Sequence, residues 1–290
     1  MTQLQHSELI LNADGSIFHL HLLPEEIADL IILVGDQDRV SVVSEFFDKI
    51  EVRKQNREFC THTGTYKGKR ISVVSTGIGT DNIDIVVNEL DALANIDLKK
   101  REIKKEHRQL NFIRIGTSGA LQAEIPVDTP VASAIGCGFD GLLNFYANRS
   151  KINIEPLEKA FLKHMDYNQL LPVPYFVNAS EELLKKVAFD MVQGITISAP
   201  GFYGPQGRVL RLPIIDSKVN DKIEAFRFND TRITNYEMEC SAIYGLSAQL
   251  GHNALTICNI IANRRRGEYS TDYRPHMIDT IKKVLDRFTA

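Results

Sequence analysis

The segment 112–121 (FIRIGTSGAL) constrains the fold most, because it places an arginine inside an apolar run that ends in glycines. Residues 112–115 predict a short buried strand. Residues 116–119 predict a tight turn where the backbone can approach a ligand closely. Arg114 needs a partner, since an unpaired buried charge is very costly. An anion held at the strand end and an internal carboxylate both meet that need, and this segment alone does not choose between them.

The rest of the chain alternates apolar runs with segments of helical spacing, which predicts an α/β fold with a largely parallel or mixed sheet. We expect strands at residues 16–23, 30–34, 58–66, 70–76, 130–135, 142–146, 194–198, 233–236 and 254–261. We expect helices at residues 40–47, 81–95, 156–165, 181–191, 241–250 and 275–288.

No repeat, low-complexity segment or linker divides the 290 residues. The sequence therefore predicts a single three-layer α/β/α domain over residues 1–290 with a central mixed β-sheet. Residues 1–17 are polar and predict a flexible N-terminal arm. Residues 95–110 are rich in charge and are interpreted as an insertion that forms a solvated helix extension or loop.

Composition excludes several function classes. The net charge of −3 gives no general affinity for nucleic acid. No apolar run approaches the ~20 residues that span a bilayer, and the N-terminus is no signal peptide, so neither a membrane nor secretion is expected. The four cysteines form no CxxC pair and predict reduced thiols in a cytoplasmic protein. Histidine shows no metal-ligand spacing, so no confident metal site is expected.

Four predicted strand ends carry glycine or acidic turns beside charged residues, at 35–39, 77–82, 116–119 and 237–239. Ligands of such sheets bind at the carboxyl ends of the strands. Arg39 and Arg114, with nearby backbone N–H groups, could together hold a phosphate dianion. The pattern is neither a nucleotide P-loop nor a dinucleotide fingerprint. The glycines at 77 and 79 are interpreted as a packing turn.

Two further groups leave alternatives open. Glu237 and Glu239 would point opposite ways on an extended strand, so one could accept from sugar hydroxyls, yet acidic residues are also favoured at a helix N-terminus. Phe202, Gln206 and Arg208 could stack on a flat ring and read the edge of a base. The same three residues also describe an exposed loop.

Eight stretches in order resemble the uridine phosphorylase branch of the type I nucleoside phosphorylase (purine nucleoside/uridine phosphorylase) family. They are FHL at 18–20, GDQDR at 35–39, REF at 57–59, STGIG at 75–79, FIRIGTSGALQ at 112–122, FYGPQGR at 202–208, NYEMEC at 235–240 and IIANR at 260–264. Their order makes the resemblance specific and extends it over nearly the whole chain, and it implies the fold of that family.

The resemblance implies a site that two subunits share. Phosphate would be bound by Gly35, Arg39, Arg114 and Thr117, with Arg57 from the neighbouring subunit. The nucleoside would contact Ser118, Gly119, Phe202, Gln206, Arg208, Glu237, Met238 and Glu239, with His19 from the neighbouring subunit, while Arg264 sits behind Gln206 and Arg208. Catalysis would rest on Arg208, Gln206, Glu239 and Arg114.

The resemblance implies phosphorolysis of pyrimidine nucleosides, converting uridine and phosphate into uracil and ribose 1-phosphate in nucleoside salvage. Inorganic phosphate is the co-substrate, no cofactor is expected, and the protein would be a homodimer or a homohexamer. The purine enzymes and nucleosidases place an aspartate shortly after residues 254–261, where this chain has none before Asp272. The alternatives are a thymidine, deoxyuridine or broader preference, or a non-catalytic nucleoside-binding relative.

The chain departs from the family pattern at several positions. Gln37 stands where proline is usual, and the Gly and Pro of GPQGR are swapped. A monovalent cation such as K⁺ at the dimer interface would use Glu58, Ile78 and the position of Asn82, where serine is usual. Asn82 therefore puts that cation site in doubt.

Overall fold

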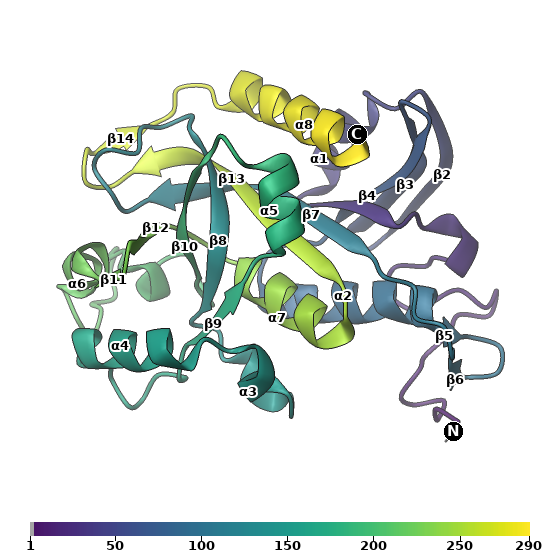
Figure 1. Ribbon diagram of the computed structural model, residues 1–290, viewed down its shortest axis with the longest axis horizontal. Coiled ribbons are helices and arrows are strands. Elements are labelled where there is room, and N and C mark those ends of the chain that lie inside the picture. Colours follow the sequence, from purple (N-terminus) through teal and green to yellow (C-terminus); the bar gives the residue numbers. More distant parts are fainter. Residues whose placement is uncertain (1–2) are drawn as a thin grey trace.

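The computed structural model describes residues 3–290 and is built on one large mixed β-sheet (Figure 1). In pairing order its strands are β11 (Arg227–Phe228), β12 (Thr231–Glu237), β10 (Val192–Ser198), β8 (Pro130–Gly138), β13 (Asn253–Asn263), β7 (Asn111–Ala120), β1 (Leu30–Val34), β4 (Lys69–Ser75), β3 (Phe59–Tyr66) and β2 (Lys49–Asn56). Strand β9 (Tyr175–Asn178) pairs with β8, and β14 (Glu268–Tyr269) pairs with β13.

Half of the sheet closes into a ring because β7 is long. β7 has 10 residues and its parallel neighbour β1 has 5, so β7 extends well beyond the end of β1. There it pairs antiparallel with β12, with Gly119 opposite Tyr236 and Ala120 opposite Asn235. Strands β12, β10, β8, β13 and β7 thus form a closed ring, and β1, β4, β3 and β2 continue from it as an open sheet.

Helices cover both faces of the sheet, because the central strands are apolar on both sides. Alternate residues of β1 enter different cores: Ile31 and Leu33 pack with α2 (Thr80–Asn95) and α7 (Cys240–Leu250). Ile32 and Val34 pack with α1 (Gln37–Ser44), α5 (Glu181–Val187) and α8 (Arg274–Thr289). A third core joins α4 (Glu155–Met165) and α6 (Val219–Ala225). The predicted α/β/α layering around a mixed sheet is confirmed.

Most of the expected elements form where the pattern indicated, including the hairpin of β3 and β4 and the end of α7 at Gly251, whose φ is +80°. Two expected strands are absent. Residues 142–146 were expected as a strand but hold a 3₁₀ helix, Leu142–Phe145, which begins after Gly141 in the left-handed region. Residues 16–23 form turns, with a single bridge between Ile17 and Leu11.

The expected glycine turn at residues 116–119 is wrong. These residues continue β7, and their neighbours on β13 stay in register through Thr117 and Ser118. Gly116 is needed for a different reason. A Cβ at this position would lie 2.0 Å from a terminal nitrogen of Arg114, so glycine makes room for the arginine side chain over its own strand.

The charged stretch and the N-terminal arm pack against each other. Strands β5 (Ile96–Asp97) and β6 (Glu102–Ile103) form a short hairpin, where a solvated helix extension or loop was expected. The backbone N–H of Leu4 donates to the carbonyl of Arg101 at 2.9 Å. Leu9 is only 6% exposed and belongs to the main core. Residues 3–17 are therefore held by packing, where a loose arm was expected.

A buried histidine ties the end of the insertion to the domain. His252 Nδ1 accepts a hydrogen bond from the N–H of Leu110 at 3.1 Å, so its ring proton resides on Nε2. Nε2 lies 3.0 Å from a carboxylate oxygen of Asp91 and donates to it. His107 stacks on His252 and hydrogen-bonds the carbonyl of Leu250 at 2.9 Å. These three side chains lie close enough to suggest a metal site, but both nitrogens of His252 are committed to hydrogen bonds.

Among residues 3–290, no helix has the length and apolar character needed to cross a bilayer.

The packed arm predicts a stability difference between two adjacent residues. Leu9→Ala should lower the free energy of unfolding by about 2–3 kcal/mol, because it removes buried methyl groups from the core. Ile10→Ala is the matched control, since Ile10 is 46% exposed, and should change stability by no more than about 0.5 kcal/mol. Urea denaturation measures both, and equal midpoints would contradict the packing described here.

Candidate active site

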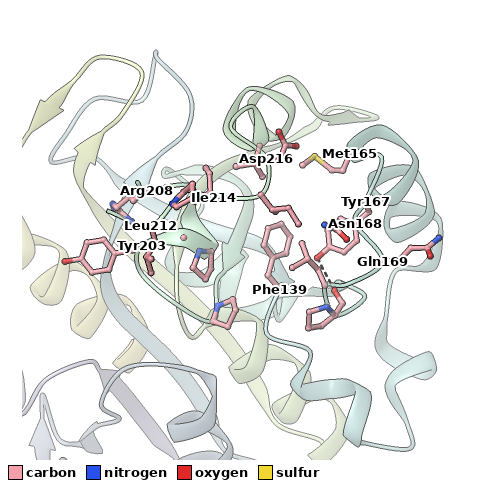
Figure 2. Close-up of a pocket in the computed structure, with 18 of the residues that line it drawn as sticks. Phe139, Met165, Tyr167, Asn168, Gln169, Tyr203, Arg208, Leu212, Ile214 and Asp216 are labelled. Atoms are coloured by element: carbon pink, nitrogen blue, oxygen red, sulfur yellow. Dashed lines mark hydrogen bonds between the residues drawn. The ribbon is translucent and has the colours of Figure 1, made fainter. Parts of the chain in front are cut away.

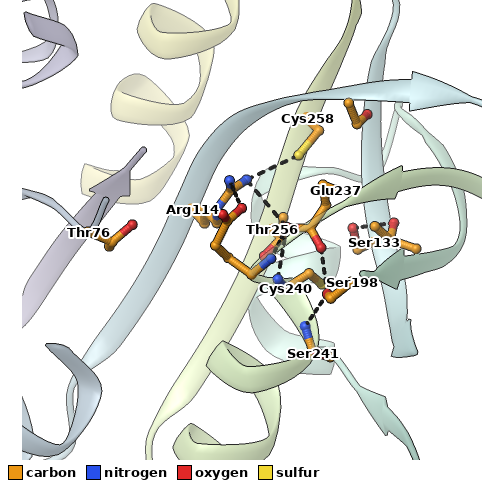
Figure 3. A network of polar contacts seen from close by, with 12 residues as sticks. Thr76, Arg114, Ser133, Ser198, Glu237, Cys240, Ser241, Thr256 and Cys258 are labelled. Atoms are coloured by element: carbon orange, nitrogen blue, oxygen red, sulfur yellow. Dashed lines mark hydrogen bonds and ion pairs between the residues drawn. The ribbon is translucent and has the colours of Figure 1, made fainter. Parts of the chain in front are cut away.

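Arg114 lies at the centre of a buried polar network at the middle of β7 (Figure 3). Its side chain is 5% exposed and forms an ion pair with Glu239. Glu237 Oε2 lies 3.6 Å from Nη1, and the Cys258 sulfur lies 3.4 Å from the same nitrogen. The internal-carboxylate explanation for Arg114 is therefore correct for the ligand-free protein, and an anion would have to share or replace those carboxylates.

Burial and the neighbouring charges shift the pKa values of this network in opposite directions. Burial by itself would lower the pKa of Arg114, but the carboxylates of Glu239 and Glu237 outweigh it and raise that pKa. Burial raises the pKa of Glu237, against the lowering effect of Arg114. Burial also raises the pKa of the Cys258 thiol to about 12, so Cys258 is a neutral thiol at physiological pH.

The two glutamates converge, where an extended strand would have turned them apart. β12 ends at Glu237, and the chain then turns into α7 with Glu239 as its N-cap. Glu237 Oε2 accepts from the backbone N–H groups of Glu239 and Cys240, each at 2.8 Å. Its Oε1 accepts from the Ser198 hydroxyl at 2.5 Å. Glu237 therefore satisfies the N–H groups at the start of α7 and also holds the backbone of Glu239 in place.

The glycine turn after β4 contributes a backbone donor to this network. The N–H of Gly79 donates to Oε1 of Glu239 at 2.8 Å. Gly77 and Gly79 both have positive φ, of +72° and +97°, which glycine adopts readily. Glu239 is thus fixed by Arg114 on one oxygen and by a backbone donor on the other.

The register of the parallel strands brings the predicted phosphate-binding residues together where β1 ends beside β7. Leu33 of β1 lies beside Arg114 of β7, and β1 ends one residue later at Val34. Gly35 therefore leaves the sheet next to Gly116 of β7. A Cβ on Gly35 would have no atom within 4 Å, so the space beside this backbone is open.

Arg39 and Thr117 lie at the same edge. Arg39 is in the first turn of α1, and its guanidinium pairs with the N-cap carboxylate of Asp36 at 2.8 Å. Thr117 follows Gly116 on β7 and is half-buried.

The predicted base-reading residues form one cluster in the loop after β10. Gln206 is 3% exposed whereas Phe202 is 50% exposed, so the loop is buried at Gln206 and open to solvent at Phe202. Arg208 donates to Gln206 Oε1 at 2.5 Å and lies 3.7 Å from the Phe202 ring centre. Arg264 donates to Oε1 at 3.3 Å from behind. With Oε1 held by two arginines, the Gln206 Nε2 donor turns away from them. Burial and Arg264 lower the pKa of Arg208 to about 10, which leaves it charged at neutral pH.

The remaining predicted nucleoside residues lie on β7 and directly after β12. Ser118 is buried, and its hydroxyl accepts from Asn235 Nδ2 at 2.9 Å. Gly119 pairs with Tyr236 where the ring of strands closes. Met238, between the two glutamates, is half-buried.

The two residues predicted to serve a neighbouring subunit lie near the turn between β2 and β3. His19 Nδ1 lies 2.6 Å from Oε1 of Glu89, and its backbone carbonyl accepts from Asn56 at 2.8 Å. Arg57 is exposed with φ of +54°, and its carbonyl accepts from Gln37. Gln37, which replaces the usual proline, thus ties the phosphate loop to the Arg57 turn.

The candidate cation residues gather around Gly77. Its ideal Cβ would lie 2.3 Å from the Asn82 amide nitrogen and 3.2 Å from Glu58 Cγ. The Asn82 Nδ2 donates to the Ile78 carbonyl at 3.4 Å. An amide donor therefore lies beside the carbonyl that a cation would use.

A large cavity of about 1080 Å³ lies beside the base-reading loop (Figure 2). Phe139, Met165, Leu212 and Ile214 give it an apolar lining, and Arg208 forms part of its wall. None of the predicted phosphate or ribose residues lines it. The cavity is thus a neighbour of the predicted reaction centre and does not contain it.

Sequence reasoning missed two contributors to the network, Ser198 and Cys258. Ser198 also accepts from the N–H of Ser241 at 2.8 Å, which links two segments around Glu237. Ser198 is the last residue of β10, and Cys258 lies within the apolar β13. The hydroxyl of Ser198 at a strand end could have indicated a site residue from the sequence. No local sequence feature indicates Cys258.

Residues 29–290 match the sequence profile of the phosphorylase superfamily. The chain belongs to this superfamily. It is 29% identical to a uridine phosphorylase of Thermococcus kodakarensis, over 88% of this chain and 80% of that protein. It is 32% identical to a DeoD-type purine nucleoside phosphorylase of Alkaliphilus metalliredigens, over 83% of this chain and 85% of that protein.

A solved structure agrees with this membership. A Trypanosoma brucei nucleoside phosphorylase that shows uridine phosphorylase activity superposes with a TM-score of 0.85 and 28% identity. The match covers 97% of this chain and 100% of that one. The expected family and its fold are thereby confirmed for this superfamily member.

The Arg114 side chain lies over Gly116 of its own strand, so alanine should destabilise the protein more at Gly116 than at Gly35. Gly116→Ala should lower the free energy of unfolding by about 3 kcal/mol, because the new methyl group displaces a guanidinium that pairs with buried carboxylates. Gly35→Ala is the control at the same edge and should cost less than about 1 kcal/mol, because its Cβ meets open space. Chemical denaturation of both variants would contradict this account if Gly35→Ala were the more destabilised.

Proposed function

We propose that this protein catalyses the phosphorolysis of uridine, with uracil and ribose 1-phosphate as products. The observation that carries the proposal is the direct contact between Arg114 and Glu239. An arginine suits phosphate, and a carboxylate suits the vicinal hydroxyls of ribose. The contact between them puts the two reactants side by side, with the anomeric carbon above the pair.

The phosphate dianion would bind among Arg39, Arg114, Thr117 and the backbone at Gly35, with Arg57 of a neighbouring subunit. Arg114 would keep its contact with Glu239 while it donates to phosphate, so both ligands are positioned by one guanidinium. Phosphate would then attack the anomeric carbon from the face opposite the base, with inversion. Positioning and preorganised charge supply the catalysis, and little proton transfer by the protein is needed.

The leaving uracil would be stabilised by Gln206 and Arg208. Negative charge develops on the ring oxygens and N3 of uracil as the glycosidic bond breaks. The Gln206 Nε2 and the Arg208 guanidinium would be donors for that charge, and Arg264 holds Gln206 through its Oε1. Phe202 would pack against the ring, and Ser118, Gly119 and Met238 would line the pocket. His19 from a neighbouring subunit would contact the ribose 5′-hydroxyl.

A pyrimidine substrate is favoured over a purine one, although relatives of both kinds are similar to this chain. β13 is followed by Arg264, Arg265 and Arg266, so no aspartate is available there to protonate a purine, and the nearby Glu268 is paired with Arg266. Thymidine and deoxyuridine remain the alternative substrates, because the edge that Gln206 and Arg208 read is common to uracil and thymine.

We further propose that residues 1–290 work as one phosphorylase domain in a homodimer or a homohexamer of three dimers. Sharing of His19 and Arg57 across an interface requires such an assembly. No cofactor is needed, and the Asn82 amide would replace K⁺ at the Ile78 carbonyl. The free cysteines fit a reducing cytoplasm, where nucleoside salvage takes place.

The reaction is tested with uridine in the presence and in the absence of inorganic phosphate. Free uracil and ribose 1-phosphate should appear in equal amounts, and only when phosphate is present. Uracil release without phosphate would show a hydrolase and end the proposal. Uridine binding by calorimetry with no release under either condition would indicate a non-catalytic relative.

Two arginine variants should separate the roles of the phosphate and base groups. Arg208→Ala should lower kcat by about 100-fold with little change in KM for phosphate, since it removes a preorganised donor to the leaving base. Arg39→Ala should instead raise KM for phosphate by at least about tenfold. Steady-state kinetics with each substrate varied in turn measures both. A phosphate KM left unchanged in Arg39→Ala would overturn the assignment of the phosphate loop.

A further inference from the structure

Asn259, near the C-terminal end of β13, is a buried amide with no partner. Its side chain is 0% exposed. Neither its Nδ2 nor its Oδ1 hydrogen-bonds to any group in residues 3–290. Buried polar groups in proteins are nearly always hydrogen-bonded, and one left unpaired costs free energy. An amide with both atoms unpaired therefore needs an explanation.

The strand register directs this amide toward the predicted phosphate site. Asn259 lies beside Thr117 in the parallel pairing of β13 with β7. Paired residues of parallel strands project to the same face, so the two side chains are neighbours. Two residues earlier on each strand, and so on the same face, Ile257 and Ile115 also form a pair and enter the core beneath α1. Asn259 and Thr117 therefore lie just beyond that core, on the side of the sheet where α1 carries Arg39.

The chemistry of the two side chains is complementary. When a threonine hydroxyl donates its proton to phosphate, its oxygen is free to accept a hydrogen bond. An amide Nδ2–H₂ is a suitable donor to that oxygen, and consecutive hydrogen bonds strengthen one another. The Asn259 amide has both Nδ2 protons available among the described residues.

We propose that Asn259 is a positioning residue for phosphate, acting through Thr117. Its Nδ2 donates to the Thr117 hydroxyl when phosphate binds and so fixes the direction in which that hydroxyl donates. This contact would give the Nδ2 group of the amide a partner when phosphate binds. The inference rests on the proposed function in one respect: phosphate must bind at the edge formed by Gly35, Arg39, Arg114 and Thr117.

The test compares Asn259→Ala and Asn259→Leu with the wild type. Both variants should raise KM for phosphate about tenfold, while KM for uridine stays within twofold. Both should leave the melting temperature of the ligand-free protein unchanged or raise it, because an unpaired polar group is removed. The stabilisation that saturating inorganic phosphate gives in a thermal melt should shrink in both.

Ile257→Val is the matched control on the same face of β13. It should lower the melting temperature slightly and leave KM for phosphate unchanged. A purely structural role for Asn259 predicts the opposite pattern, with a lower melting temperature and unchanged KM for phosphate, and this result would overturn the proposal. Unchanged kinetics together with an unchanged melting temperature would overturn it too.

The thermal melts separate this inference from the proposed function. If the wild type released no uracil but phosphate still stabilised it, a smaller stabilisation of Asn259→Ala would support the role of Asn259 and refute only the reaction. An equal stabilisation of both proteins by phosphate would refute the role of Asn259.

Discussion

The buried ion pair between Arg114 and Glu239 is the interaction on which the site depends. It joins the middle of β7 to the N-terminus of α7, two elements far apart in the chain. A buried pair of this kind contributes little net stability, but loss of one partner is costly because it leaves an unpaired charge. Such a pair therefore fixes geometry more than it adds stability, which suits a site that must hold two reactants at a set distance.

The surrounding structure keeps this pair in place through backbone donors and small residues. Gly116 leaves room for the guanidinium, and Gly79 supplies an N–H to Glu239. Glu237 holds the first N–H groups of α7 and is itself held by Ser198. Preorganisation of this sort costs nothing at the moment of reaction, because the dipoles are already oriented.

Local pattern was sufficient to predict most elements and the chemistry of the site residues. The run LIILV at β1 is typical of a strand buried on both faces, and the apolar spacing of α2 is typical of an amphipathic helix. Local pattern gave a wrong prediction at a glycine, because glycine can either form a turn or leave room for a neighbouring side chain. Gly116 was expected to make a turn, but it accommodates the side chain of a neighbouring residue.

The sequence by itself determined the α/β alternation and the family, because these follow from residue type and order, and it supplied the residues proposed to bind phosphate and the base. Only the tertiary structure decided that Glu237 and Glu239 converge on Arg114, that Gln206 is buried, and that Asn259 lies beside Thr117. These relations depend on strand register and on the closing of β7 against β12. Both are set by contacts between distant segments, which no local periodicity encodes.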